Sequence, residues 1–147
     1  MCGIVGYKSK NNLKIDKNKL VKSILHRGPD SQNFFEIKKN NQIKNSIFLG
    51  FARLAILDRN SRSNQPFSFK NLVLCFNGEI YNFIKLKNEL IKNFNIKFET
   101  NSDTEVLIKL IFYYGLNKSL KKLEGMWAFA LYNKNNEELI LCRVRFG

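Results

Sequence analysis

Apolar residues recur along this chain at two spacings, one typical of buried strands and one typical of amphipathic helices. Runs rich in β-branched and aromatic residues predict strands over Gly3–Tyr7, Asn33–Ile37, Ile47–Ile56, Leu72–Phe76, Trp127–Tyr132 and Glu138–Arg143. Apolar residues at helical spacing predict helices over Asp16–Leu25, Phe83–Phe94 and Thr104–Tyr114. Because the strands can pair with near neighbours while the helices are grouped between them, the pattern predicts an α+β layered sandwich rather than an alternating βαβ fold.

The segments between these elements carry start, stop and turn signals. Ser102-Asp103-Thr104-Glu105 is a capping box at the start of the third helix, and Gly115 is its stop. His26-Arg27-Gly28-Pro29-Asp30 ends the first helix, and residues 58–65 predict a polar loop. Asn77-Gly78 directly follows a predicted strand and predicts a type I′ hairpin turn, so this dipeptide has a structural explanation before any chemical one.

Length and charge narrow the classes of protein to consider. The 147 residues suffice for one domain with a packed core, and 44% of them are hydrophobic. Lys and Arg number 25 against 12 Asp and Glu, a net charge of +13 that would favour a nucleic-acid partner. The lysines are scattered and accompany many Asn and Ile, so we expect a solvated surface and no nucleic acid. A nucleic-acid-binding module stays an alternative, and it would bind with steep salt dependence.

The absence of a recognisable targeting signal and the use of cysteine both indicate a cytoplasmic protein. Every apolar run is far shorter than the roughly 20 residues that a membrane span needs, and no signal-peptide pattern opens the chain. The three cysteines, Cys2, Cys75 and Cys142, are odd in number and far apart. This spacing argues against a disulfide framework and a metal site, and Cys75 and Cys142 are interpreted as core residues.

Cys2 is the most informative residue because of its position. Removal of Met1 would leave Cys2 with both a thiol and a free α-amine, whose unperturbed pKa of about 7.7–8.0 suits a general base. The alternative is an incidental cysteine at a frayed end, but a strand that begins at Gly3 would hold this end in place. His26, the only histidine, precedes a Gly-Pro turn and is interpreted as a structural residue rather than as a partner of Cys2.

Four further positions combine with Cys2 into a site for an amino acid with an amide side chain. Arg53 lies in an apolar segment and needs a partner, for which a carboxylate is the natural choice. Asp103 could bind an ammonium group, although a favourable charge at a helix N-terminus is the simpler explanation. The Asn77 amide and the Gly78 N–H could stabilise an oxyanion. Glutamine fits this description.

Six short motifs occur in order along the chain, and together they resemble a known family. They are Met1–Gly6, His26–Asp30, Arg53–Asp58, Phe76–Asn82, Ser102–Glu105 and Leu123–Ala130. This series resembles the glutaminase domain of glutamine-hydrolysing asparagine synthetases, which are class II glutamine amidotransferases and N-terminal-nucleophile hydrolases. The resemblance spans the whole chain, and the forms HRGPD and NGEIYN favour asparagine synthetase over the glucosamine-phosphate and purine-pathway relatives.

The resemblance implies a fold, a reaction and a set of site residues. The fold would be a four-layer αββα sandwich over residues 1–147, a type 2 glutamine amidotransferase domain that lacks its last strands and the synthetase domain. Glutamine would be hydrolysed to glutamate and ammonia, with Cys2, Asn77 and Gly78 catalytic. The glutamine-binding positions would be Arg53, Leu54, Ala55, Ile56, Leu57, Asn77, Gly78, Glu79 and Asp103.

The same resemblance implies the partners of this domain. The ammonia would supply ATP-dependent asparagine synthesis from aspartate in a synthetase domain, present in cis or in trans. ATP and Mg are expected only in that domain and no cofactor in this chain. A homodimer is the candidate assembly of a full-length protein.

Three departures from the family pattern keep alternatives open. The family usually has His where Phe51 stands, and Asp where Val144 stands in the sequence RVRFG. The chain also stops at Gly147, which is expected to leave an open sheet edge near Arg143. The alternatives are the same domain serving another acceptor, as in sugar or cell-surface amidation, and an inactive remnant.

Overall fold

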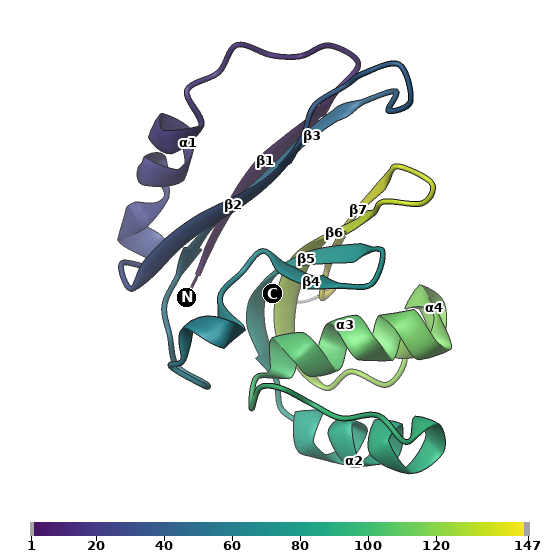
Figure 1. The fold of residues 1–147 in the computed structure, drawn as a ribbon. Coiled ribbons are helices and arrows are strands. Elements are labelled where there is room, and N and C mark those ends of the chain that lie inside the picture. The colour runs from purple at the N-terminus through teal and green to yellow at the C-terminus, as the bar shows by residue number, and fades with distance from the viewer. Residues whose placement is uncertain (1, 146–147) are drawn as a thin grey trace.

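A computed structural model describes residues 2–145 of the chain (Figure 1). Its strands are β1 (Gly3–Ser9), β2 (Ser31–Ile37), β3 (Ser46–Arg53), β4 (Phe67–Phe69), β5 (Leu72–Ile80), β6 (Gly125–Asn133) and β7 (Glu138–Arg143). Its helices are α1 (Lys17–Ser23), α2 (Phe83–Phe94), α3 (Asp103–Tyr114) and α4 (Leu116–Leu120), with 3-10 turns at Leu25–Arg27 and Ser61–Ser63. Met1 and the final Phe146-Gly147 of the RVRFG sequence lie outside the described residues.

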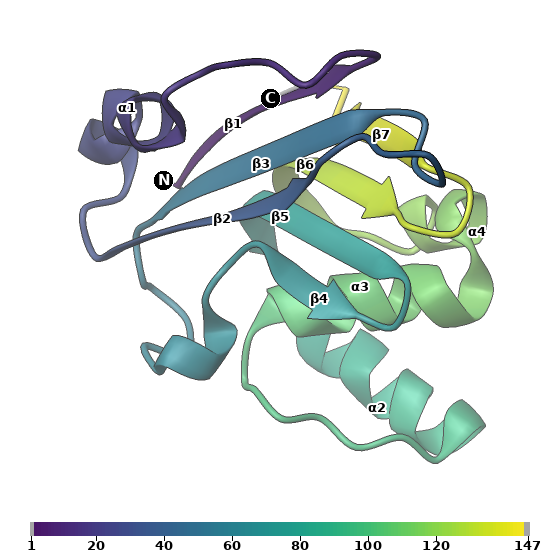
Figure 2. The ribbon, with the colours of Figure 1, turned by 45° about the horizontal axis from the view of Figure 1, so that its top comes forward.

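The strands form two antiparallel sheets, ordered β1-β3-β2 and β4-β5-β6-β7. The two sheets lie one over the other, with α1 outside the first sheet and α2, α3 and α4 outside the second (Figures 1 and 2). The prediction of an α+β fold with locally paired strands is therefore confirmed. Among residues 2–145, no helix is long and apolar enough to cross a membrane.

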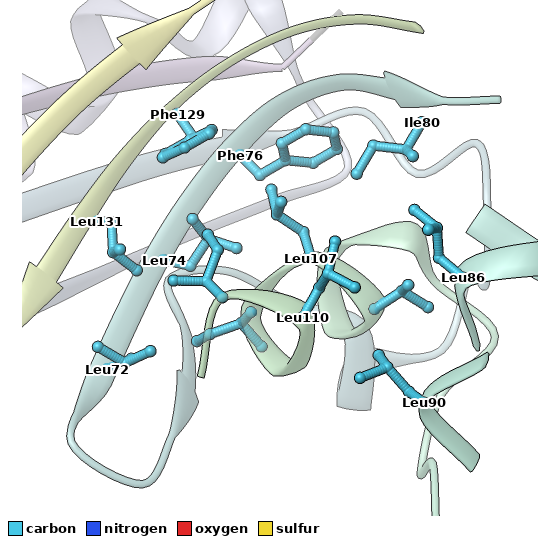
Figure 3. Close-up of a cluster of buried hydrophobic side chains, with 13 residues drawn as sticks. Leu72, Leu74, Phe76, Ile80, Leu86, Leu90, Leu107, Leu110, Phe129 and Leu131 are labelled. Atoms are coloured by element: carbon cyan, nitrogen blue, oxygen red, sulfur yellow. The ribbon is translucent and has the colours of Figure 1, made fainter. Parts of the chain in front are cut away.

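One hydrophobic core lies between the second sheet and α3. Leu107 and Leu110 of α3 point toward Leu74 and Phe76 of β5 (Figure 3). Helix α3 is buried from Asp103 to Ile111, because the sheet covers one side and α2 packs on another. Only Leu86 and Leu90 of α2 are buried, as expected for an outer amphipathic helix.

A second core fills the space between the two sheets. Strand β3 is buried along its whole length, with Phe51 and Leu49 packed against Val73 and Cys75 of β5. Phe51, which stands where the family usually has His, is thus a core residue that does not line the site cavity. Cys75 is a core residue as predicted, and burial raises the pKa of its thiol far above the usual value. Cys142 is half-buried beside the other core.

The largest difference from the sequence expectation concerns Asn77-Gly78, which is not a hairpin turn. Strand β5 continues through both residues, with Asn77 opposite Ala128 and Gly78 opposite Trp127 of β6. The prediction was wrong because the long partner strand β6 extends the pairing to Ile80, information that a local dipeptide signal does not contain. Strand β3 also stops at Arg53, three residues before the predicted end, and β4 and α4 were not predicted.

The capping box before α3 is only half formed. The Ser102 hydroxyl accepts a hydrogen bond from the Glu105 N–H at 3.4 Å, as predicted. The Glu105 carboxylate instead accepts bonds from the N–H groups of Glu99 at 3.0 Å and Thr100 at 2.7 Å, and it pairs with Lys109 at 2.6 Å. Glu105 therefore fixes the segment that leads into α3.

We expect Glu105→Ala to reduce the free energy of unfolding by about 3–5 kcal/mol, because it leaves the buried Lys109 ammonium uncompensated. Urea denaturation measures this loss. Glu99→Ala is the matched control and should change stability by less than about 0.5 kcal/mol, since the Glu99 side chain is exposed. Equal losses in the two variants would contradict the assignment.

The contribution of Glu105 should also depend on pH. Burial alone would raise the pKa of this carboxyl group, but the bonds from Lys109, Thr100 and Glu99 hold the pKa below its usual 4.5. The stabilisation is therefore present above pH 4.5 and is lost as the pH falls through the folded-state pKa.

Candidate active site

The pairing of β1 with β3 places Cys2 beside the end of β3. Gly3 lies opposite Ala52 in the ladder, so the preceding residue, Cys2, reaches the chain just after Arg53. The Cys2 Sγ accepts a hydrogen bond from the Leu54 N–H at 3.3 Å and lies 3.6 Å from the Leu54 carbonyl oxygen, to which the thiol donates. The thiol is therefore fixed by backbone groups rather than by a side chain, and it is half-buried.

The His26–Asp30 motif braces the same segment of β3. A Cβ at Gly28 would lie 2.4 Å from the Ala52 carbonyl oxygen, so only glycine permits this approach. The Asp30 N–H donates to the Arg53 carbonyl at 3.0 Å, and its carboxylate accepts from the Ala55 N–H at 2.7 Å. From the sequence alone, the glycine of this motif has a role as a helix stop, and Asp30 has no role of its own. The His26 side chain is exposed and forms no hydrogen bond with any other residue of the described range, Cys2 included.

The edge of β5 changes partner where β4 ends. Strand β4 pairs with β5 only as far as Leu74, which lies opposite Phe67. Beyond that point the buried Gln65 side chain takes the place of a strand. Its amide Nε2 donates to the Phe76 carbonyl at 3.1 Å, and its Oε1 accepts from the Phe76 N–H at 2.5 Å.

The side chains of Gln65 and Asp103 bind the edge of β5 on either side of a short stretch that has no neighbouring strand on that edge among residues 2–145. Four residues after Phe76, the Asp103 carboxylate accepts from the Ile80 N–H at 3.1 Å. Alternate residues of an extended strand direct their backbone groups to the same edge. Gly78 lies midway between Phe76 and Ile80, so it occupies the stretch of β5 between the Gln65 and Asp103 side chains, where it lines the cavity described below.

Asn77 and Gly78 are held close to β6 at this point. A Cβ at residue 78 would lie 2.2 Å from the Met126 carbonyl oxygen, and Gly78 has a φ of 152°, so glycine is required. The Asn77 side chain lines the cavity described below, and its Oδ1 is buried without a hydrogen bond from any residue in 2–145. The Asn77 amide is thus not committed to a protein partner.

Asp103, the first residue of α3, is a buried carboxyl group at the edge of the cavity. Burial, with a smaller contribution from the neighbouring Glu79 charge, raises its pKa to about 6, although hydrogen bonds from backbone N–H groups such as that of Ile80 act in the opposite direction. The carboxylate therefore ionises near neutral pH and would be stabilised by a bound cation.

Arg53 is buried, as expected for a residue at the end of an apolar strand, but its partners differ from the expectation. Its guanidinium donates to carbonyl oxygens of the loop between β3 and β4, and no carboxylate within residues 2–145 forms an ion pair with it. The predicted carboxylate partner is thus not supplied by the described part of the chain. The loop between β3 and β4 begins near the start of β1 in Figure 2.

These groups surround one cavity of about 220 Å³ at the junction of the two sheets and α3. Of the predicted site residues, the cavity wall includes Cys2, Arg53, Leu54, Ile56, Leu57, Asn77, Gly78, Glu79 and Asp103. Ala55 is outside the wall, since its N–H is turned to Asp30. The wall also includes residues that sequence reasoning missed, namely Ser63, Gln65, Phe76, Ser102, Thr104 and Met126.

The chemistry available in this cavity is that of a thiol, carboxylates, an amide and a cation. Thiol, amide and backbone N–H groups suit attack on a carbonyl carbon and stabilisation of the resulting oxyanion. Within residues 2–145, no three His, Cys, Asp or Glu side chains are grouped so that they could hold a metal ion.

Comparison with protein families and with curated proteins finds relatives that agree with one another in their described activity. A family model described as a glutamine amidotransferase domain matches residues 1–147. Asparagine synthetase [glutamine-hydrolyzing] 1 of Bacillus subtilis is 39% identical over 155 residues, which cover 100% of this chain and 23% of that protein. Putative asparagine synthetase [glutamine-hydrolyzing] 2 of Methanocaldococcus jannaschii is 36% identical over 165 residues, which cover 100% of this chain and 30% of that protein. The chain therefore spans less than a third of the length of these relatives.

A solved structure supports the same relationship. The structure of glutamine phosphoribosylpyrophosphate amidotransferase from B. subtilis, complexed with ADP and GMP, is similar to this one. The match covers 69% of this chain and 24% of the amidotransferase chain. The TM-score is 0.56 and the sequence identity is 31%. The chain belongs to the glutamine amidotransferase family, as a class II domain related to the glutaminase domains of asparagine synthetases.

Proposed function

We propose that this domain hydrolyses glutamine to glutamate and ammonia with Cys2 as the nucleophile. The observation that carries the proposal is that the Cys2 thiol, the Asn77 amide, the Gly78 backbone and the Asp103 carboxylate meet in one cavity. These groups are far apart in the sequence and come from both sheets and from α3. Each has a distinct task in the hydrolysis of an amino acid amide.

In this proposal, the thiol attacks the side-chain carbonyl carbon of glutamine. The α-amine of Cys2, free once Met1 is removed, takes the thiol proton, because its usual pKa is close to neutral. The Asn77 amide and the Gly78 N–H donate to the developing oxyanion. Ammonia leaves with the proton returned by the amine, and water then hydrolyses the thioester to glutamate and restores the thiol.

The charged groups of the cavity would orient the amino acid backbone of the substrate. The Asp103 carboxylate accepts hydrogen bonds from the α-ammonium group, and Glu79 adds negative charge beside it. The buried Arg53 attracts the α-carboxylate. Leu54, Ile56 and Leu57 would pack against the substrate chain from the loop side of the cavity.

The relatives suggest where the ammonia goes. Several are asparagine synthetases, so we propose that the ammonia is used for ATP-dependent asparagine synthesis from aspartate in a synthetase domain. ATP and Mg would bind in that domain. A second candidate is another acceptor, since the domain also matches a phosphoribosylpyrophosphate amidotransferase. Activity assays with aspartate and with other acceptors, on a protein that carries the downstream domain, would separate the two.

Cys2→Ala should abolish glutamine hydrolysis, measured as ammonia or glutamate release. An N-terminal extension that blocks the α-amine should also abolish it, and the mass of the intact active protein should show that Met1 is missing. Cys142→Ser is the control and should keep the activity, because Cys142 is outside the cavity wall. Hydrolysis by a protein that retains Met1 would exclude the amine as the base.

Substitutions at Asn77 and Arg53 should have different kinetic effects. Asn77→Ala should lower kcat by roughly 10²–10³, because it removes an oxyanion donor. Arg53→Leu should instead raise KM by roughly 10- to 100-fold, the equivalent of one charge-assisted hydrogen bond of about 1.5–3 kcal/mol. Unchanged kinetics in both variants would show that the site is assigned wrongly.

Asp103→Asn should weaken glutamine binding and yet stabilise the fold above pH 6. The folded-state pKa is about 6 and the usual value is 3.8, so the stability contributed by protonated Asp103 is complete below pH 3.8 and is lost as the pH rises through 6. Asparagine cannot ionise and can still accept from the Ile80 N–H.

The melting temperature of Asp103→Asn should therefore exceed that of the wild type at pH 7 and equal it near pH 4. Its KM for glutamine should be raised at pH 7. Glu138→Gln, at an exposed carboxylate of β7, should show neither effect. A lower melting temperature of Asp103→Asn at pH 7 would contradict the prediction.

A further inference from the structure

The Arg53 guanidinium is a buried cation bound by neutral oxygens only. The Arg53 residue is 6% exposed. Its Nη1 donates to the Asn60 carbonyl at 3.1 Å and to Asn64 Oδ1 at 2.8 Å. Its Nη2 donates to the carbonyls of Leu57 at 3.2 Å and Asp58 at 2.5 Å. The four Nη–H donors are thus used, while the charge has no counter-ion within residues 2–145.

Asn64 differs from the other three acceptors because it contributes a side chain. Main-chain carbonyls cannot be changed in charge by substitution, whereas the Asn64 side chain can be. The Ser31 hydroxyl donates to the same Oδ1 at 3.2 Å, which fixes the amide with its oxygen toward Arg53. Asn64 does not line the cavity, so it lies behind Arg53 with respect to bound substrate.

A buried cation without a counter-ion reduces the stability of the fold unless an anion binds to it. An aspartate at position 64 would supply that anion permanently and would cancel the attraction for a substrate carboxylate. The neutral amide instead holds the guanidinium in place and leaves its full charge to the cavity, where Arg53 forms part of the wall.

We propose that Asn64 is a positioning residue that makes Arg53 selective for substrates with an α-carboxylate. It acts through Arg53 and does not contact the substrate. The proposal rests on glutamine hydrolysis in this cavity, and it adds the residue that keeps the carboxylate-binding charge both fixed and unpaired.

The test compares L-glutamine with its α-amide, which has the same side chain and no α-carboxylate. The full chain and its Asn64→Asp variant are assayed with both substrates by ammonia release. The wild type should prefer L-glutamine. Asn64→Asp should raise KM for L-glutamine by about 10- to 100-fold with kcat nearly unchanged, and should leave KM for the α-amide unchanged, because only the carboxylate is repelled.

Two further variants serve as controls. Asn135→Asp makes the same charge change in the exposed turn between β6 and β7, and it should leave the preference for L-glutamine as in the wild type. Asn64→Ala removes the oxygen without adding charge. It should reduce the preference for L-glutamine less than Asn64→Asp does, and it tests the proposal even if the aspartate variant does not fold.

Each outcome supports or overturns the proposal. A loss of preference in both Asn64 variants supports it. An unchanged preference, or an equal loss of kcat/KM for both substrates, would overturn the role of Asn64 while leaving glutamine hydrolysis in place. If the wild type hydrolysed neither substrate, the proposed function itself would be wrong, and the role of Asn64 would fall with it.

Discussion

The site depends on which groups form hydrogen bonds with the free edge of β5 beyond the end of β4. A buried strand edge must have its N–H and C=O groups satisfied, and here side chains replace a neighbouring strand. Gln65 satisfies Phe76, and Asp103 satisfies Ile80. Gly78, midway between them, has no such side-chain partner among residues 2–145, and it lines the cavity. The same arrangement therefore stabilises the fold and provides a substrate with backbone groups.

The cavity also requires that the two sheets stack in a fixed relation. Cys2 directly precedes β1 and Arg53 ends β3 of the first sheet, while Asn77 and Gly78 belong to the second. The β1–β3 register brings Cys2 to the Leu54 backbone, and the hydrogen bonds of Asp30 hold the segment after β3. A shift of either sheet would separate the thiol from the Asn77 amide, so packing of the core between the sheets determines the geometry of the site.

Buried charged side chains have different kinds of partner in the core and at the cavity. The buried Glu105 is compensated by Lys109 and by several N–H groups, as a structural charge must be. Arg53 and Asp103 are buried without a counter-ion among the described residues and are held by neutral or backbone groups. Their ionised forms are thus poised to bind groups of opposite charge. Burial at the cavity costs stability and increases the attraction for a zwitterionic amino acid.

The sequence by itself determined most of the element types and nine residues of the cavity wall, because periodicity, caps and motifs are local signals. It located α2 and β7 to the residue and found the groups now proposed as nucleophile and substrate ligands. It could not assign Asn77-Gly78 to a strand or find Gln65 and Asn64. Their roles come from contacts with Phe76 and Arg53 that only the folded chain makes. The tertiary structure alone decided these points, because a partner strand and a buried acceptor are set by residues distant in sequence.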